Sequence, residues 1–307
     1  MLRYTLRRLV VALPSIFGAV TLVFMLAHVT PGDPVDAMLG ETAAPADRQQ
    51  LRNALGLDRP LFEQYRHYLS GLVVGDLGAS LHTGESVFAT VVQHYPATLE
   101  LAAAGVVVAV SLALPLALLS AANPASAIDL GARVFSTLAI ALPNFWIAPL
   151  LILLFSIALE WTPVAGRGGL SHLFLPAVTI GFGMSASLTR LLRNSLLEHQ
   201  NDAYIQTARA KGASRQRVYL VHLLRNAALS TVTLLGLQCG ALLAGAVVTE
   251  TVFAWPGIGR LLLNALQTRD YPLIQACVLF FAATYLLINL ATDLLHAAID
   301  PRVRTTS

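Results

Sequence analysis

The charged residues that could take part in specific chemistry gather in one stretch, residues 202–227 (DAYIQTARAKGASRQRVYLVHLLRNA), between two long apolar runs. We call this stretch the basic loop. It contains Lys211, the only lysine of the chain, and the arginines Arg209, Arg215, Arg217 and Arg225, with Arg193 just upstream. Ammonium and guanidinium groups form ion pairs and charge-assisted hydrogen bonds with acidic partners. The composition therefore predicts a loop that binds an acidic surface, of protein or of lipid.

Enzymatic chemistry is not indicated elsewhere. A phosphate loop needs GxxxxGK[ST], and Lys211 does not stand in one, so any ATP must bind to another polypeptide. The eight histidines are scattered, without HExxH or an i, i+4 pair, which predicts no metal site. Neither GxSxG nor SxxK occurs, and Cys239 and Cys277 form no CxxC. We expect no catalytic residues, and no cofactor bound by this chain itself.

The elements that position the basic loop are membrane helices. The chain is 307 residues long, 56% hydrophobic and only 12% charged, whereas soluble domains carry roughly 25% charged residues. A span needs about 20 apolar residues, and only helices satisfy their own backbone in lipid. We predict an all-α polytopic membrane protein with six transmembrane helices, the first an uncleaved span: Leu9–Val29, Leu99–Leu119, Val134–Ile157, Phe174–Leu192, Leu229–Val248 and Ile274–Leu295.

The distribution of basic residues predicts the orientation. With the N-terminus inside, 13 of the 20 lysines and arginines fall on the cytoplasmic side. Residues 1–8, the loop 193–228 and residues 298–307 are then cytoplasmic, and residues 30–97 form an extracytoplasmic segment before the transmembrane domain, residues 98–297. Leucines and tyrosines between Leu61 and Leu72 recur at helical spacing, so this segment is expected to be a small folded cap.

Local signals divide the basic loop into two helices. Asp202 is a typical N-cap for a short helix, Ala203 to Lys211, and Gly212 fits a position of positive φ. Ser214 would cap a second helix, Arg215 to Asn226. The narrow, alanine-rich first helix could insert into a groove of another protein, or could lie on anionic lipid, and periodicity alone leaves both open.

A second polar segment, residues 250–275 (ETVFAWPGIGRLLLNALQTRDYPLIQ), precedes and enters the last span. WPGIG predicts a turn with an interfacial tryptophan, and RDYP a break before the helix, although a re-entrant loop that only packs the outer mouth remains an alternative. Glu250, like Glu100, Glu160 and Asp293, lies near a span end, where snorkelling to the interface is expected.

The fifth predicted span carries two further features. Gln238, midway along the span, either faces a solute path or forms an interhelical hydrogen bond. Gly236 and Gly240, four residues apart, predict a helix-packing face.

The basic loop resembles the "EAA" loop of permeases of ATP-binding-cassette importers, in the form found in the dipeptide/oligopeptide/nickel family. Gln206, Thr207 and Ala208 occupy the Glu-Ala-Ala positions, and Ser230 stands where a proline is frequent. FAWPGIG and RDYP resemble the outer-loop signature of the same family, and PGDP (31–34), LGLDRP (55–60), GDLGAS (75–80) and PATLEL (96–101) resemble its B-type subunit.

The resemblance implies a type I importer permease fold in the cell membrane. It implies contacts with the ATPase at Asp202, Tyr204, Gln206, Thr207, Ala208, Arg209, Ala210, Lys211 and Gly212. The outer signature comprises Glu250, Phe253, Trp255, Pro256, Gly257, Gly259, Arg269, Asp270, Tyr271 and Pro272. Implied partners are a C-type permease, one or two ATPase subunits that bind ATP and Mg²⁺, an extracytoplasmic binding protein and membrane lipid, but no nucleic acid.

The implied solutes are dipeptides or oligopeptides, with nickel chelates or haem as alternatives. A secondary transporter is a remote alternative, because the spans lack a carboxylate near the midplane. A membrane scaffold without transport is the third possibility that the residues leave open.

Overall fold

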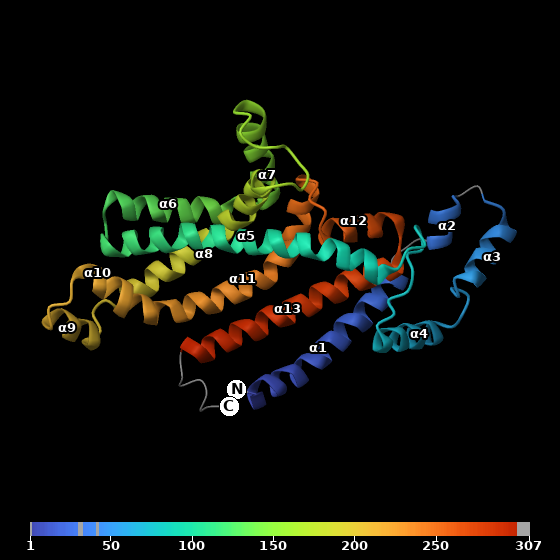
Figure 1. Ribbon diagram of the computed structural model, residues 1–307, viewed down its shortest axis with the longest axis horizontal. Coiled ribbons are helices and arrows are strands. Elements are labelled where there is room, and N and C mark those ends of the chain that lie inside the picture. Colours follow the sequence, from blue (N-terminus) through green and yellow to red (C-terminus); the bar gives the residue numbers. More distant parts are fainter. Residues whose placement is uncertain (1, 30–32, 41–42, 300–307) are drawn as a thin grey trace. The chain divides into compact units, whose positions relative to one another are not determined.

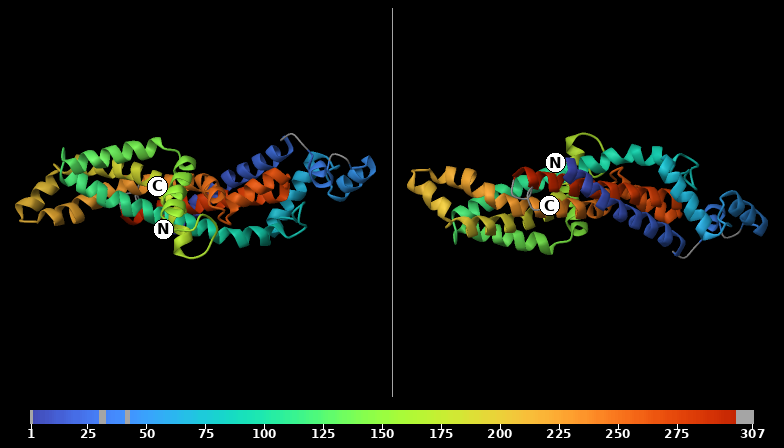
Figure 2. Two further views of the ribbon diagram at one scale, coloured as in Figure 1. Left: turned by 90° about the horizontal axis from the view of Figure 1, so that it is seen from above. Right: turned by 90° about the horizontal axis from the view of Figure 1, so that it is seen from below.

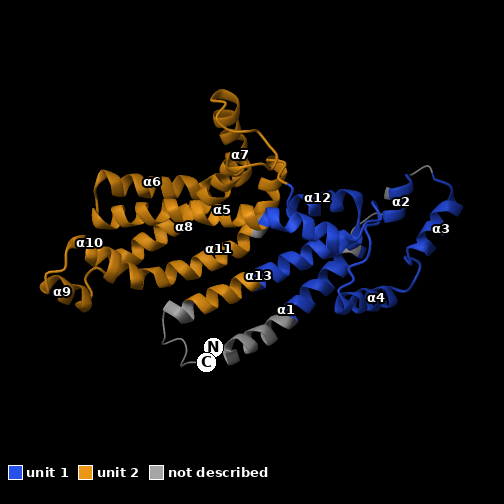
Figure 3. Cartoon of the chain, viewed as in Figure 1, with its two compact units in different colours: residues 1–98, 256–286 blue, residues 99–255, 287–307 orange. Residues whose placement is uncertain are grey.

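The computed structural model describes residues 2–29, 33–40 and 43–299. Among these, the regular elements are helices, with one isolated β-bridge between Ala79 and Ser86. The chain divides into two compact units (Figure 3). Unit 1 comprises residues 1–98 and 256–286, and unit 2 comprises residues 99–255 and 287–307. Each unit therefore combines segments that are distant in the sequence.

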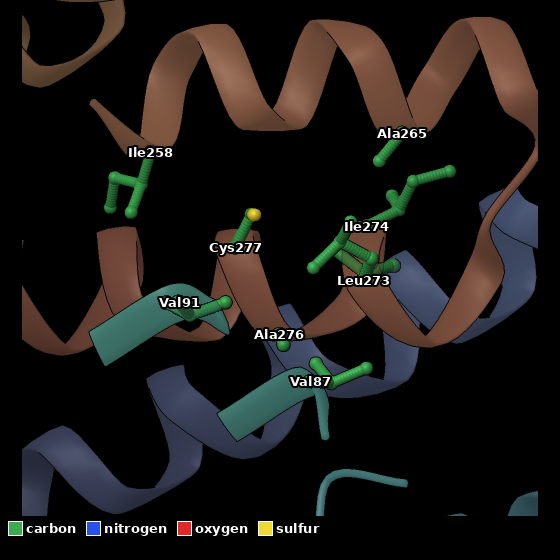
Figure 4. Packing of buried hydrophobic residues seen from close by; sticks show 9 residues of the cluster. Val87, Val91, Ile258, Ala265, Leu273, Ile274, Ala276 and Cys277 are labelled. Atoms are coloured by element: carbon green, nitrogen blue, oxygen red, sulfur yellow. The ribbon is translucent and has the colours of Figure 1, made fainter. Parts of the chain in front are cut away.

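Unit 1 is built around the ends of two long helices. Its elements are α1 (Leu2–Val29), α2 (Pro34–Leu39), α3 (Pro45–Ala54), α4 (Leu61–Val74), the first part of α5 (Val87–Ala122), α12 (Ile258–Thr268) and the first part of α13 (Tyr271–Ile299) (Figure 1). A buried cluster joins α1, α5, α12 and α13, with Val87 and Val91 facing α13 and with Ile258 and Ala265 on α12 above it (Figure 4). In helices that span a bilayer, such contacts stabilise mainly by van der Waals packing.

The predicted amphipathic helix in the extracytoplasmic segment is present as α4. It contacts α1 through Tyr65 and Tyr68, whose rings lie 5.1 and 5.8 Å from that of Phe24. Two side-chain hydrogen bonds strengthen the contact, one between the hydroxyls of Thr21 and Tyr65 (2.6 Å) and one from His28 Nε2 to Gln64 Oε1 (3.1 Å). The segment is therefore folded onto the first helix over these residues.

Unit 2 is a bundle around α8. Its elements are the rest of α5, α6 (Ala127–Ala141), α7 (Asn144–Leu151), the π-helix η1 (Ile152–Ala158), α8 (Leu170–His199), α9 (Ala203–Ala210), α10 (Arg215–Arg217), the π-helix η2 (Val218–Leu223), α11 (Leu224–Val252) and the end of α13. At the crossing of α5 and α8, a Cβ on Gly181 would lie 2.7 Å from the carbonyl oxygen of Gly105. Glycine is required there because the two backbones approach so closely.

Four described helices are long and apolar enough to span a membrane: residues 87–122, 170–199, 215–242 and 271–295. The predicted span Val134–Ile157 is instead broken, since α6 and the α7–η1 segment meet at 106°. The cause is Pro143, which lacks an amide hydrogen and disfavours helical geometry at Leu142, where ψ is 119°. If this bent pair is one span, five are present.

The first predicted span lies partly outside the side chains that the structure describes. Within those, α1 contributes a shorter apolar stretch, Pro14–Leu26. A sixth span over residues 9–29 therefore stays a prediction.

Candidate functional site: the basic loop and the outer signature

The basic loop forms one end of unit 2, away from α7 (Figure 2). Asp202 has the extended conformation of an N-cap (ψ 149°), as predicted, but its carboxylate accepts a hydrogen bond from His199 (2.8 Å) rather than from the helix. α9 ends at Ala210, and Gly212 adopts the predicted positive φ of +81°. Ser214 accepts a hydrogen bond from the backbone N–H of Arg217 and so caps the next helix, also as predicted.

The second helix of the loop does not end at Asn226. α10, η2 and α11 follow one another without a break, so the helix that starts at Arg215 continues into the fifth predicted span. Ser230 permits this continuity, because it keeps its backbone N–H, and its hydroxyl donates to the carbonyl oxygen of Ala227 (3.2 Å). The basic loop and α11 are therefore joined by one continuous helix.

α9 has one anchored face and one exposed face. Ile205 is fully buried in a cluster with residues of α5, α8 and η2, including Ala121, Leu196 and Leu223. The exposed residues of the predicted coupling set are Tyr204, Gln206, Thr207, Arg209, Ala210, Lys211 and Gly212, whereas Ala208 and Asp202 are half-buried. The helix is thus fixed to the bundle on one side and available to a partner on the other.

A second set of contacts fixes the loop to the turn between α5 and α6. The guanidinium of Arg215 donates to the carbonyl oxygen of Ala122 and to Oδ1 of Asn123 (3.3 Å). The hydroxyl of Tyr219 donates to the carbonyl oxygen of Ala121 (3.2 Å). The basic loop is therefore connected to the end of α5 and the turn that follows it, as well as to its own helices α8 and α11.

The sequence did not single out Asp129, which links three helices at the base of the loop. Its carboxylate, 2% exposed, accepts hydrogen bonds from Arg193 of α8 (2.6 Å) and Ser120 of α5 (2.6 Å), and also from the backbone N–H of Ala125 (3.1 Å). Ser126 is an N-cap signal for α6, but it does not indicate the partners of the Asp129 carboxylate. The hydroxyl of Ser126 does cap α6.

The outer signature is divided between the two units. In unit 2, Glu250, Phe253 and Trp255 are at most 2% exposed, so burial replaces the interfacial positions predicted for Glu250 and Trp255. The guanidinium of Arg167 lies 5.9 Å above the Trp255 ring and pairs with Glu100 (2.6 Å), a residue of the PATLEL motif. These contacts fix the residues before the WPGIG turn inside the unit.

In unit 1, the rest of the signature contacts two other motifs. Pro256 and Gly257 lead into α12, where the backbone N–H of Ile258 donates to the hydroxyl of Thr98 (2.9 Å). Gly259 lies in the first turn of α12, and Arg269 ends the helix in the left-handed region (φ +56°). Thr98 belongs to PATLEL, so this motif supports the start of α12.

The RDYP part of the signature is held by Asp270, which is 1% exposed. Asp270 accepts hydrogen bonds from the hydroxyl of Ser80, in the GDLGAS motif, and from the backbone N–H groups of Leu81 and Leu273 (3.3 Å each). Tyr271 and Pro272 form the first turn of α13. Motifs far apart in the sequence therefore form one bonded cluster.

Gln238 has a buried Oε1 that accepts no hydrogen bond from any described residue. The interhelical hydrogen bond that was one of its two predicted roles is therefore not formed within the described chain. Gly236, two residues earlier, lies so close to Thr292 of α13 that a Cβ there would be 2.4 Å from its side chain. This contact confirms that Gly236 belongs to a helix-packing face.

The family model described as "binding-protein-dependent transport system inner membrane component" matches residues 113–305. A companion model for the N-terminal part of such components matches residues 1–102. The chain belongs to this family. It is thus a permease component of an ABC importer, a multi-pass inner membrane protein, and not the subunit that carries out enzymatic chemistry.

Curated relatives match over nearly the whole chain. The dipeptide transport system permease protein DppB of Escherichia coli K12 is 40% identical over 336 residues, 99% of each chain. The di/tripeptide permease DppB of Pseudomonas aeruginosa UCBPP-PA14 and the glutathione permease GsiC of E. coli K12 are both 39% identical, again over 99% of each chain.

Solved structures show the fold. A crystal form of the methionine ABC transporter MetNI, in an inward-facing conformation, matches with a TM-score of 0.55 at 18% identity, over 68% of this chain and 96% of that chain. An amino acid ABC transporter crystallised with histidines matches with a TM-score of 0.50 at 17% identity, over 70% of this chain and 94% of that chain. The permease therefore has the type I importer fold.

Proposed function

We propose that the permease forms, with a second C-type permease, the path by which short peptides enter the cell. The observation that carries this substrate class is the full-length similarity, at 39–40% identity, to permeases named for dipeptides and di/tripeptides. The similarity to a glutathione permease supports the same class, because glutathione is itself a tripeptide.

In this proposal both termini and the basic loop are cytoplasmic, as the distribution of arginines favours. ATP and Mg²⁺ bind to one or two separate ATPase subunits, since this chain has no phosphate loop. A binding protein delivers the peptide to the outer face. There, residues 30–97 and the half-buried members of the outer signature, Pro256, Arg269, Tyr271 and Pro272, form its docking surface.

The basic loop is proposed as the contact with the ATPase. Three observations support this role: the exposed face of α9, its anchoring through Ile205, and the continuity of the following helix with α11. An ATPase that moved α9 would also pull on the end of α5 through Arg215 and Tyr219. The ATP cycle then changes which side of the membrane the path faces.

Gln238 is the proposed path-lining residue. Its buried Oε1 lacks a hydrogen-bond donor within the described chain, and an unpaired buried acceptor is costly. A donor from the second permease or from a passing peptide amide would satisfy it. The unpaired oxygen therefore supports a place for Gln238 on the path.

The experiment is reconstitution of the permease with its C-type partner, ATPase subunits and binding protein in proteoliposomes. We expect uptake of labelled dipeptide. This uptake should require ATP on the side of the membrane where the ATPase subunits lie. Liposomes without the ATPase subunits are the control, and their uptake should stay at background. Uptake that persists in this control would indicate a secondary transporter, and no dipeptide uptake in the full system would refute the peptide assignment.

A further inference from the structure

Unit 1 contains a cavity that the proposed transport path does not use. Its volume is about 410 Å³, within the ~300–1,000 Å³ that is usual for small-molecule sites. The wall is formed by the end of α1, the residues before α4, α4 itself, the GDLGAS segment and the first turns of α13. All of these segments belong to the same unit, so the cavity is formed within one compact body.

The inner wall presents a polar side chain that has no partner. Gln275 lines the cavity, is 7% exposed, and forms no hydrogen bond with any described residue. Its amide oxygen and nitrogen are not enclosed like Oε1 of Gln238, so they remain accessible from the cavity, where a ligand can pair with both. The Gln64 amide, which also lines the cavity, is by contrast satisfied by His28 and by the carbonyl oxygens of Leu57 and Arg59.

Aromatic groups line the same cavity. Phe24 and Tyr68, stacked with 20° between their ring planes, line the cavity together with Tyr271. Burial raises the pKa of Tyr68 to about 12, so its hydroxyl stays protonated at neutral pH. That hydroxyl forms no hydrogen bond with the described residues, which makes it a second group able to donate to a ligand.

Charges of both signs line the same cavity at solvent-exposed positions. Arg59 and Glu63 are exposed, and neither side chain forms an ion pair or a hydrogen bond with a described residue. Asp76 is also exposed, but its carboxylate already accepts from the backbone N–H of Gly78 (2.9 Å). One cation and one anion are therefore available to a ligand that carries both charges.

We propose that this cavity is a binding site for a short zwitterionic peptide. Gln275 pairs with the peptide amide, Glu63 with the terminal ammonium, and Arg59 with the terminal carboxylate, while Phe24 and Tyr68 contact a side chain. The inference deepens the proposed function, on which it rests for the ligand class. The site is formed entirely by residues of unit 1 and does not include Gln238.

The test uses the complete transporter in nanodiscs, without nucleotide and without the binding protein, and measures binding of labelled Ala-Ala. We expect saturable binding that weakens about fivefold or more in Gln275→Leu, which keeps the volume but removes the amide. The matched control is Gln93→Leu, an exposed glutamine of α5 outside the cavity, which should bind like the wild type. Equal affinity in Gln275→Leu and wild type, or no saturable binding up to about 10 mM, overturns the proposal.

A second arm avoids the core and so does not depend on folding of the Gln275 variant. N-acetyl-Ala-Ala should bind the wild type more weakly than Ala-Ala, and Glu63→Gln should abolish this difference. Ala-Ala amide, which lacks the terminal carboxylate, should likewise bind the wild type more weakly than Ala-Ala, and Arg59→Gln should abolish this difference. If the wild type binds the acetylated and amidated peptides as tightly as Ala-Ala, the site does not recognise a zwitterion and the proposal fails.

The two proposals fail separately. Ala-Ala binding with these variant effects, but without ATP-driven uptake in proteoliposomes, would support the cavity site and refute the proposed transport of this peptide. Uptake of Ala-Ala with no saturable binding to the isolated transporter would leave the transport function in place and refute the cavity site.

Discussion

Asp129 is the residue whose removal should most disturb the base of the basic loop. Its carboxylate faces Arg193, a side chain that is only 15% exposed. Removing one partner of a buried ion pair leaves the other charge uncompensated, at a cost of about 3–5 kcal/mol. We therefore expect Asp129→Ala to lower the thermal unfolding temperature of the detergent-purified permease strongly.

The matched control for this prediction is Arg133→Ala. Arg133 also pairs with Asp129, at 3.5 Å, but its side chain is 54% exposed. Exposed pairs contribute about 0–1 kcal/mol, so this variant should unfold near the wild-type temperature. Equal loss of stability in both variants would show that burial of Arg193 is not the decisive factor.

Gly212 sets the geometry of an element, because it ends α9 with a φ of +81°. A β-branched residue there is strained by about 1–2 kcal/mol or more, since its Cβ collides with the backbone in the left-handed region. Gly212→Val should therefore reorient the end of α9 and reduce peptide uptake per ATP hydrolysed, with normal insertion in the membrane. The measurement is the ratio of uptake to phosphate release in proteoliposomes.

Gly131→Val provides the comparison for Gly212→Val. Gly131 lies exposed within α6, has no positive φ, and has open space around the position of a Cβ. Valine is a better helix former than glycine, so the transport ratio should not change. A normal ratio in Gly212→Val would remove the reason for assigning coupling to the geometry of α9.

The sequence predicted the elements that depend on local chemistry. Asp202, Gly212 and Ser214 lie where capping and turn preferences put them, because those preferences involve residues only a few positions apart. The bend at Pro143 was missed, although proline carries the signal, because apolar composition alone does not distinguish a continuous span from a bent one.

Burial in the outer signature could not be predicted in this way. Glu250 and Trp255 stand beside a span end, where the interface is the usual position, and only the fold brings Arg167 over the Trp255 ring. The hydrogen bond between Ser80 and Asp270 joins residues 190 positions apart. Neither the type nor the spacing of these two residues indicates that they pair.

At the scale of the whole molecule, the orientation in the membrane is the main prediction. Gln216 lies exposed in the basic loop and Ser70 lies exposed on α4. Cysteine at position 216 should react with a membrane-impermeant maleimide only from the cytoplasmic side, and cysteine at position 70 only from outside, because the positive-inside rule separates the two. Intact cells and inverted vesicles provide the two sides.

The native cysteines set the background of this experiment. Cys277 is fully buried and Cys239 is partly buried, so the unmodified permease should react weakly. Labelling of both engineered positions from the same side would contradict the topology.

The exposed position of Lys211 at the end of α9 has a practical consequence. Apart from the α-amino group, this side chain is the only primary amine of the chain. An amine-specific acylating reagent therefore modifies a single side chain of the permease, and that side chain lies where the ATPase is proposed to dock. Mass spectrometry would measure how strongly Lys211 is protected from acylation at successive stages of the ATP cycle. This protection would report how often the contact is occupied, without any engineered label.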